Sequence, residues 1–173
     1  MKNNNHPHVR WLICLCLLCA APRAWALTSG DYSYTDDGWD VTITGYTGAG
    51  GAVTIPSVLG PSSHPVISIG YIAFHNCTAL TSVTIPSSVT SIGAYAFSGC
   101  TSLTSVTIPS SVTSLGTYAF YSCTGLTSVT IPSSVTSLGN FAFGLCNGLT
   151  SVNCLGNAPT LRTAAFLNAT GTV

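Results

Sequence analysis

Charged residues are almost missing from this chain. Only 5% of its 173 residues are Asp, Glu, Lys or Arg, against about 25% in ordinary soluble proteins. Glu and Gln are absent altogether, and residues 53–173 contain no acidic residue. Enzymes that cleave glycosidic bonds need two carboxylates flanking the substrate. The sequence offers no such pair over most of its length, and we predict no glycosidase activity there.

Basic residues are equally scarce. The chain has one Lys and three Arg, and Arg162 is the only one of them beyond residue 23. Binding to nucleic acid requires several cations that neutralise phosphates, and binding to anionic lipid requires a basic cluster. We therefore predict no nucleic-acid partner and no attachment to a lipid surface by charge.

The first 26 residues have the layout of a secretory signal peptide. Lys2 and Arg10 precede an apolar run over residues 11–22, and residues 24–26 form an A-x-A cleavage site. The run is short for a transmembrane helix. We predict cleavage after Ala26, no membrane span in the mature chain, and a secreted or cell-surface location. An N-terminal anchor helix is the alternative interpretation.

Neither the cysteines nor the histidines form a recognisable chemical site. Five cysteines follow the signal peptide, and four of them are 23 residues apart: Cys77, Cys100, Cys123 and Cys146, with Cys154 outside the series. The Cβ atoms of equivalent residues in stacked strands lie about 4.8 Å apart, outside the usual range of about 3.5–4.5 Å for a disulfide, so we predict free buried thiols. Zinc spacing is absent. We predict no cofactor, no metal and no catalytic residues.

Acidic residues cluster at one point, residues 36–40, with the sequence DDGWD. Carboxylates at this density suit Ca²⁺, but Asp-Gly is also typical of a hairpin turn, and we favour the turn. A Ser-His-Asp triad needs an aligned His, and the two histidines of the mature chain, His64 and His75, lie outside the acidic cluster. The sequence therefore predicts a protein that is not an enzyme.

A 23-residue period runs through the chain. The residues that repeat at this interval include five phenylalanines: Phe74, Phe97, Phe120, Phe143 and Phe166. A fixed period of this length indicates a solenoid in which each unit buries its apolar face against the next. In one unit, residues 103–108 predict a short strand, Pro109 ends it, and Val112–Leu115 predict a second. Residues 119–123 predict a helical or 3₁₀ turn with the phenylalanine inward.

The period divides the chain into parts. Two alternating segments, 31–35 and 39–46, predict a β-hairpin that caps the solenoid, and we assign the cap to residues 27–52. Residues 53–173 then form about five coils. Seven extra residues around 59–65 predict a bulging loop in the first coil. The last coil is irregular, and we predict that it lacks a cap.

The phrase from Cys100 to Pro109, CTSLTSVTIP, followed by the Leu115-Gly116 and Ala119-Phe120 pairs, resembles the BspA-like bacterial leucine-rich repeats. Leu103-x-x-Val106-x-Ile108 matches their L-x-x-L-x-L core. The resemblance covers about residues 53–166. It implies a right-handed leucine-rich-repeat solenoid, mainly β, exported to the cell surface and linked to adhesion and to binding of host matrix proteins. It brings no catalytic residues.

Contact with a partner is predicted at positions that differ between otherwise identical coils, because the core does not constrain them. Together with two tyrosines and the inserted loop, they give these residues: Tyr95, Tyr118, Tyr121, Asn140, Leu145 and His64. Tyrosine is enriched at binding hot spots. The first hypothesis is a surface module that binds a protein or a glycan. The alternative is a structural spacer or self-assembling segment that associates edge to edge.

Overall fold

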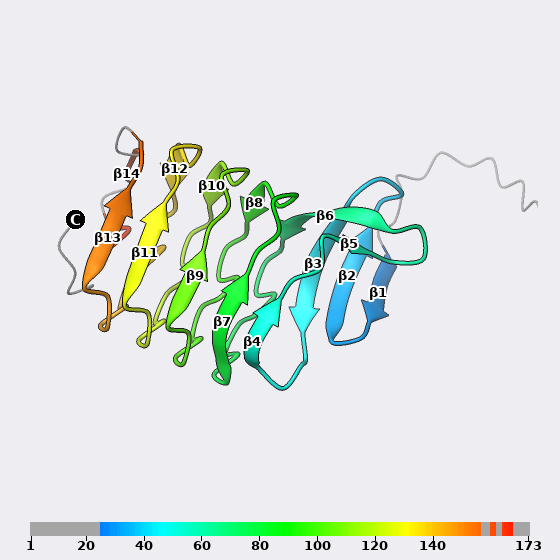
Figure 1. The fold of residues 1–173 in the computed structure, drawn as a ribbon, viewed down its shortest axis with the longest axis horizontal. Coiled ribbons are helices and arrows are strands. Elements are labelled where there is room, and N and C mark those ends of the chain that lie inside the picture. The colour runs from blue at the N-terminus through cyan, green and yellow to red at the C-terminus, as the bar shows by residue number, and fades with distance from the viewer. Residues whose placement is uncertain (1–24, 157–159, 162–163, 168–173) are drawn as a thin grey trace, which may run out of the picture.

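The computed structural model describes residues 25–156, 160–161 and 164–167, and these form a β-solenoid (Figure 1). Its strands are β1 Trp25–Ser29, β2 Tyr32–Asp36, β3 Val41–Tyr46, β4 Gly51–Thr54, β5 Val58–Leu59, β6 His64–Ile69, β7 Leu80–Thr84, β8 Ser91–Ile92, β9 Ser105–Thr107, β10 Ser114–Leu115, β11 Ser128–Ile131, β12 Ser137–Leu138, β13 Ser151–Cys154 and β14 Thr160–Leu161. The predicted leucine-rich-repeat solenoid is confirmed.

Two parallel sheets carry the coils. One has the order β13-β11-β9-β7-β4, and the other runs β6-β8-β10-β12-β14 after three strands of the cap. Equivalent residues pair at the 23-residue interval, for example Val83 with Val106 and Val129 with Val152. The valines point inward because side chains alternate along a strand, and the serine and threonine neighbours face solvent. Sequence identity between coils therefore fixes the strand register.

The cap is a three-stranded antiparallel sheet. β2 and β3 form the predicted hairpin, and β1 adds a third strand that pairs with β2. β3 then pairs in parallel with β6 of the first coil, so the cap and the solenoid share one sheet. The predicted signal peptide lies mostly outside the described residues, and β1 begins at Trp25.

A column of phenylalanine rings forms the centre of the core. The five rings from Phe74 to Phe166 stack face to face, with centroids 4.9 to 5.2 Å apart. This stacking confirms the predicted alignment. Tyr46 of the cap stacks on Phe74 at 4.9 Å and so extends the column into the cap. The cap thus covers the first coil with an aromatic ring in place of a further phenylalanine.

All five cysteines after residue 25 are free thiols, as predicted. Cys100, Cys123 and Cys146 are buried, and each thiol donates a hydrogen bond of 3.1 Å to the carbonyl of a phenylalanine in the preceding coil. The neighbouring thiol of Cys123, and to a lesser extent burial, raise the pKa of Cys100 to about 12. Cys100 is therefore a neutral packing group.

The segment predicted to be a helical or 3₁₀ turn is instead a series of tight turns. Amides of the second coil alternate in their partners: Ser98 N–H bonds to Tyr95 O in its own coil, and Phe97 N–H bonds to Ala119 O in the next. A 3₁₀ helix would keep all these bonds within the segment. In this turn every second amide instead donates its hydrogen bond to the next coil, and Tyr95 adopts a φ of 56°.

The seven-residue insertion forms a hairpin and packs onto the cap. β5 pairs with β6 in antiparallel register, and the turn between them brings Gly60 beside Tyr34 and Asp36. The segment predicted as a bulging loop is thus a hairpin whose turn lies against side chains of the cap.

The last coil departs from the pattern, as predicted. Cys154 takes the place of the buried isoleucine at the end of β11, and it is only half-buried. Among the described strands, β13 and β14 each pair on one side only. The predicted lack of a C-terminal cap concerns residues that include 168–173, which lie outside the described part, and it stays a prediction.

Candidate functional site: an aromatic strip on the turns

Five aromatic side chains line the outer side of the turns that join the two sheets. We call this set the aromatic strip: Tyr71, Tyr95, Tyr118, Tyr121 and Phe141. Tyr95, Tyr118 and Phe141 occupy one position in three successive coils, and their rings stack with centroids 4.7 and 5.1 Å apart. These three rings form a second column of stacked rings. It has the same arrangement as the buried phenylalanine column but is only partly buried.

The other two rings of the strip are turned. Tyr71 meets Tyr95 at 86° and Tyr121 meets Tyr118 at 84°, both in edge-to-face contact. The stacked rings cover one another's faces, whereas the turned rings are not part of the stack. Edge-to-face pairs are favourable in their own right, so both orientations are stable.

Backbone strain accompanies the column. Tyr95, Tyr118 and Phe141 have φ values of 56°, 59° and 55°, in the left-handed region that bulky residues rarely adopt. Such conformations cost roughly 1–3 kcal/mol each and tend to gather at functional sites. Glycine at this position would relieve the strain, yet three successive coils have an aromatic residue there. The first coil has Ile72 at this position with a φ of 54°, so the left-handed conformation recurs in each of these four coils with or without a ring.

A glycine makes room for Tyr121. A Cβ atom on Gly144 would lie 3.1 Å from Cδ2 of Tyr121, a tighter contact than the ring would tolerate without shifting. Gly144 occupies the position of Tyr121 one coil later. The Tyr121 ring therefore lies over the next coil because that coil has no side chain there.

The face around the strip has no charge. Residues 71–76, 94–99, 117–122, 140–145 and 164–167 include no Asp, Glu, Lys or Arg. Three of the six large hydrophobic residues that are exposed in the described part belong to this face: Tyr71, Ile72 and Leu167, at 63%, 44% and 49% exposure. No hydroxyl of the four strip tyrosines bonds to a described residue. The face is apolar, uncharged and carries free hydroxyls.

Five of the six predicted contact residues lie on this face. Tyr95, Tyr118 and Tyr121 belong to the strip. Asn140 is exposed beside Phe141, and Leu145 N–H bonds to Leu167 O at the edge of the face. The prediction missed Phe141, although it follows Tyr118 by one period, and Tyr71, which stands one residue before the column position.

His64, the sixth predicted residue, lies elsewhere. Its Nδ1 is 2.8 Å from Oδ1 of Asp36 in the cap, and its side chain is 24% exposed. The Gly38 amide and His64 together hold the pKa of Asp36 below its usual value, the amide being the larger cause. The pair joins the inserted hairpin to the cap, and the structure does not bring His64 together with the other five.

The carboxylates of the acidic cluster accept hydrogen bonds from amides of their own turn. Asp36 accepts a hydrogen bond from the Gly38 amide, and one oxygen of Asp37 accepts from the amides of Trp39 and Asp40 at 2.9 Å. These bonds are typical of a hairpin turn. In the described part of the chain no group of three His, Cys, Asp or Glu is arranged to hold a metal ion.

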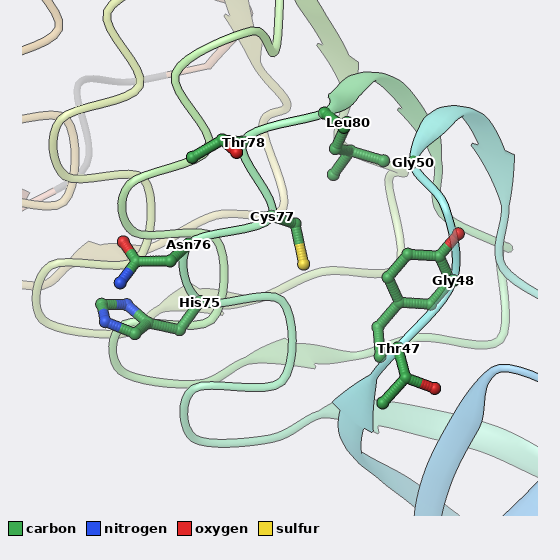
Figure 2. Close-up of a pocket in the computed structure, with 10 residues that line it drawn as sticks. Thr47, Gly48, Gly50, His75, Asn76, Cys77, Thr78 and Leu80 are labelled. Atoms are coloured by element: carbon green, nitrogen blue, oxygen red, sulfur yellow. The ribbon is translucent and has the colours of Figure 1, made fainter.

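A cavity of about 300 Å³ lies between the cap and the first coil. Its walls include Tyr46, Thr47, His75, Cys77 and Thr78. In Figure 2 the Cys77 thiol and the His75 ring do not point toward each other. The neighbouring Cys100 thiol, together with burial, raises the pKa of Cys77, so the thiol is neutral and a poor nucleophile. The residues that line the cavity include no carboxylate, and His75 is their one histidine.

Comparison with known proteins identifies the family. Residues 61–172 match the BspA type Leucine rich repeat region, in six copies. The chain belongs to this family. No curated protein is significantly similar to the chain. Leucine-rich-repeat modules are generally non-catalytic and typically bind proteins.

Solved structures of bacterial leucine-rich-repeat proteins resemble this BspA-type chain. A protein from Bacteroides capillosus is 33% identical with a TM-score of 0.67, over 76% of this chain and 99% of that one. A T. pallidum protein is 32% identical with a TM-score of 0.71, over 79% and 64%. A leucine rich cell surface protein of Faecalibacterium prausnitzii is 36% identical with a TM-score of 0.63, over 78% and 44%. The chain spans less than two thirds of the last two.

In the described residues, no helix has the length and hydrophobicity needed to cross a membrane.

Proposed function

We propose that this BspA-type chain is an exported, non-catalytic binding module that contacts a protein or a glycan at the cell surface through the aromatic strip. The observation that carries the proposal is the coincidence, on one uncharged face, of ring stacking, exposed apolar side chains and strained backbone. Strain of this kind is maintained at sites where a function requires it. The cell-surface location of the Faecalibacterium protein supports export.

Adhesion is the role that fits such a module. The strip is long in one direction, since it follows the axis of the solenoid, and it repeats a similar contact at each coil. A partner that binds along the axis would add a similar contribution at each coil. The cavity beside the cap contributes no chemistry to this role, because its thiol is neutral.

The test is saturable binding to immobilised extracellular-matrix proteins and to a glycan array. We expect at least one ligand to bind the chain, and Tyr121→Ser to weaken that binding roughly tenfold, as for a hot-spot tyrosine. Ser128→Ala, on the outer face of β11, is the matched control and should bind as the parent does. Equal loss of binding in both variants would contradict the assignment of the strip.

A second candidate is a self-assembling segment. β13 and β14 pair on one side only among the described strands, and an unpaired edge is a template for another strand. Sedimentation velocity at rising concentration tests this function. Association that vanishes when a proline replaces Cys154, whose amide alternates with those of Ser151 and Leu155 that bond to the coil of β11, would support it, and a monomer at all concentrations would exclude it.

A further inference from the structure

We propose that the outer face of the sheet formed by β4, β7, β9, β11 and β13 binds the surface of ice. The inference goes beyond the proposed function, because it concerns another face and another partner. Two rows of hydroxyl side chains run along this sheet in the direction of the solenoid axis, and Figure 1 shows its strands side by side. We call these residues the hydroxyl face: Ser82, Ser105 and Ser128 in one row, and Thr84, Thr107 and Thr130 in the other.

The register of the sheet places these hydroxyl groups at regular intervals. Ser82 pairs with Ser105 and Thr84 with Thr107, Thr107 pairs with Thr130, and the same register continues from β11 to β13. Paired residues of adjacent strands lie about 4.8 Å apart. The opposite sheet also gains one strand per coil. Both sides of the stack therefore advance by the same distance, and the two rows stay close to straight.

The hydroxyl groups of this face are not used inside the molecule, unlike those of other columns. Ser111 donates a hydrogen bond of 2.6 Å to the carbonyl of Val89 in the preceding coil. Thr104 donates one of 3.1 Å to the carbonyl of Thr81, and the equivalent residues of other coils repeat both bonds. Side chains of the hydroxyl face bond to no described residue, and all except Ser82 are exposed. Their hydroxyl groups are therefore available to water.

The interval along each row is close to an interval between water molecules in ice. Ice is a tetrahedral network, and at an O···O distance of about 2.75 Å two waters bonded to the same water lie about 4.5 Å apart. The strand spacing exceeds this by about 0.3 Å per coil, or about 0.6 Å over the three strands. Rotation about the Cα–Cβ bond moves a hydroxyl oxygen by more than this. The hydroxyl groups of one row can therefore take the places of successive waters in the lattice.

The composition of the face disfavours other partners. The residues of its five strands include no charged side chain, so the face has no attraction for phosphate or anionic lipid. They also include no Trp, Tyr or Arg, the residues that anchor protein interfaces, and no aromatic ring on which a sugar could stack. A neutral lattice of hydrogen-bonding groups fits such a face, because each coil adds the same two contacts. The buried Val83, Val106 and Val129 lie between the rows in sequence and fix them to a packed core.

The experiment makes two measurements on the full chain: the gap between the melting and freezing temperatures of a single ice crystal, and the uptake of protein into slowly growing ice. We expect the parent chain to show both, rising with concentration. The Thr107→Lys, Thr130→Lys double variant interrupts one row with bulky charges and should lose both. The matched control is Ser110→Lys, Ser133→Lys, which adds the same charges at exposed turn positions one period apart and should keep both.

Three results would overturn the inference. They are a temperature gap and ice uptake no larger than those of serum albumin at equal concentration, parental values in the Thr107→Lys, Thr130→Lys variant, and equal loss in the Ser110→Lys, Ser133→Lys control. Thr107-dependent binding to crystalline cellulose without uptake into ice would also overturn it, because the partner would then be a polysaccharide. Circular dichroism verifies that each variant is folded. Tyr121→Ser, which leaves the hydroxyl face unchanged, should keep parental ice uptake, so failure of this inference leaves the proposed function standing.

Discussion

At the scale of the residue, the strip places bulky side chains where glycine is preferred. Tyr118 has a φ of 59° and stacks on Tyr95 and Phe141. Its contribution to stability is therefore a balance between favourable stacking and unfavourable backbone geometry. The two can be separated, because glycine removes the ring and relieves the strain, whereas alanine removes the ring and keeps the strain.

We expect Tyr118→Gly to be more stable than Tyr118→Ala by roughly 1 kcal/mol, the usual advantage of glycine in the left-handed region. Both should be less stable than the parent because stacking is lost. Urea denaturation followed by circular dichroism gives the comparison. A more stable alanine variant would mean that the left-handed φ at this position is not a source of strain.

The cysteines give a second test at this scale. Burial raises the pKa of Cys146 to about 12, and the pKa of Cys100 is also about 12, above the usual value of about 8.5. The folded state therefore holds these protons when the unfolded state has released them. Stability from this source is present below about pH 8.5 and declines as the pH rises toward 12.

We expect the urea midpoint to fall between pH 9 and pH 11, the part of that window where the unfolded thiols ionise and the folded ones do not. The fall should be smaller in Cys146→Ala. In native protein at pH 8, a thiol reagent should react first with the half-buried Cys154, because the raised pKa of Cys77 keeps that half-buried thiol protonated, and all five should react after unfolding. Rapid native labelling of Cys100, Cys123 or Cys146 would contradict their burial.

At the scale of the secondary-structure element, the sequence predicted the contacts that repeat with the 23-residue period. Identical residues recur every 23 positions, so the pairing of Val83 with Val106 and the stacking of the phenylalanines followed from repetition alone. Contacts outside the period were not predictable. Tyr46 lies 28 residues before Phe74, and its place on the ring column depends on how the cap folds.

The same reasoning explains the errors and omissions at the site. The turn after each strand was expected to be helical because its residues suit a helical turn. In the structure, every second amide bonds to the next coil, and tight turns form instead. The insertion was expected to be a bulging loop, and it is a hairpin that the Asp36–His64 contact holds against the cap. Phe141 was missed although the period points to it, because the search favoured positions that vary, and Tyr71 stands one residue off the column.

Coils approach closely at the glycine after β10. A Cβ atom on Gly116 would lie 2.4 Å from the Ala94 amide nitrogen and 2.5 Å from the Gly93 carbonyl carbon. We expect Gly116→Ala to destabilise the fold by roughly 1–3 kcal/mol, since main-chain atoms of the neighbouring coil must move. Chemical denaturation measures this cost. Ser110→Ala, at an exposed position, is the control and should stay within about 0.5 kcal/mol of the parent.

At the scale of the whole molecule, stability depends on contacts between neighbouring coils. Each coil touches only the coils beside it, so the total is close to a sum of coil and interface contributions. The inner coils have neighbours on both sides, and Phe120 is fully buried between Phe97 and Phe143. Phe166 stacks on Phe143 and is only half-buried. The loss of stability caused by replacing one of these phenylalanines should therefore depend on the position of the phenylalanine along the solenoid axis.

We expect Phe120→Ala to cost roughly 3–5 kcal/mol, the usual range for a buried phenylalanine. Phe166→Ala should cost less than half as much, because it breaks one stack and removes less buried area. Thermal and urea unfolding of the two variants give the values. Equal losses would show that the molecule melts as one unit without regard to position along the axis.

The alternating amides of the turns have a consequence for the evolution of chain length. Phe97 N–H bonds to Ala119 O, and Phe120 N–H bonds to Ala142 O, in the same geometry. Excising one complete 23-residue unit would rejoin two surfaces that already complement each other, donor for acceptor. A gene encoding this chain could therefore lengthen or shorten by whole units without redesigning its cap, whereas a deletion of any other size would break the match at every later turn.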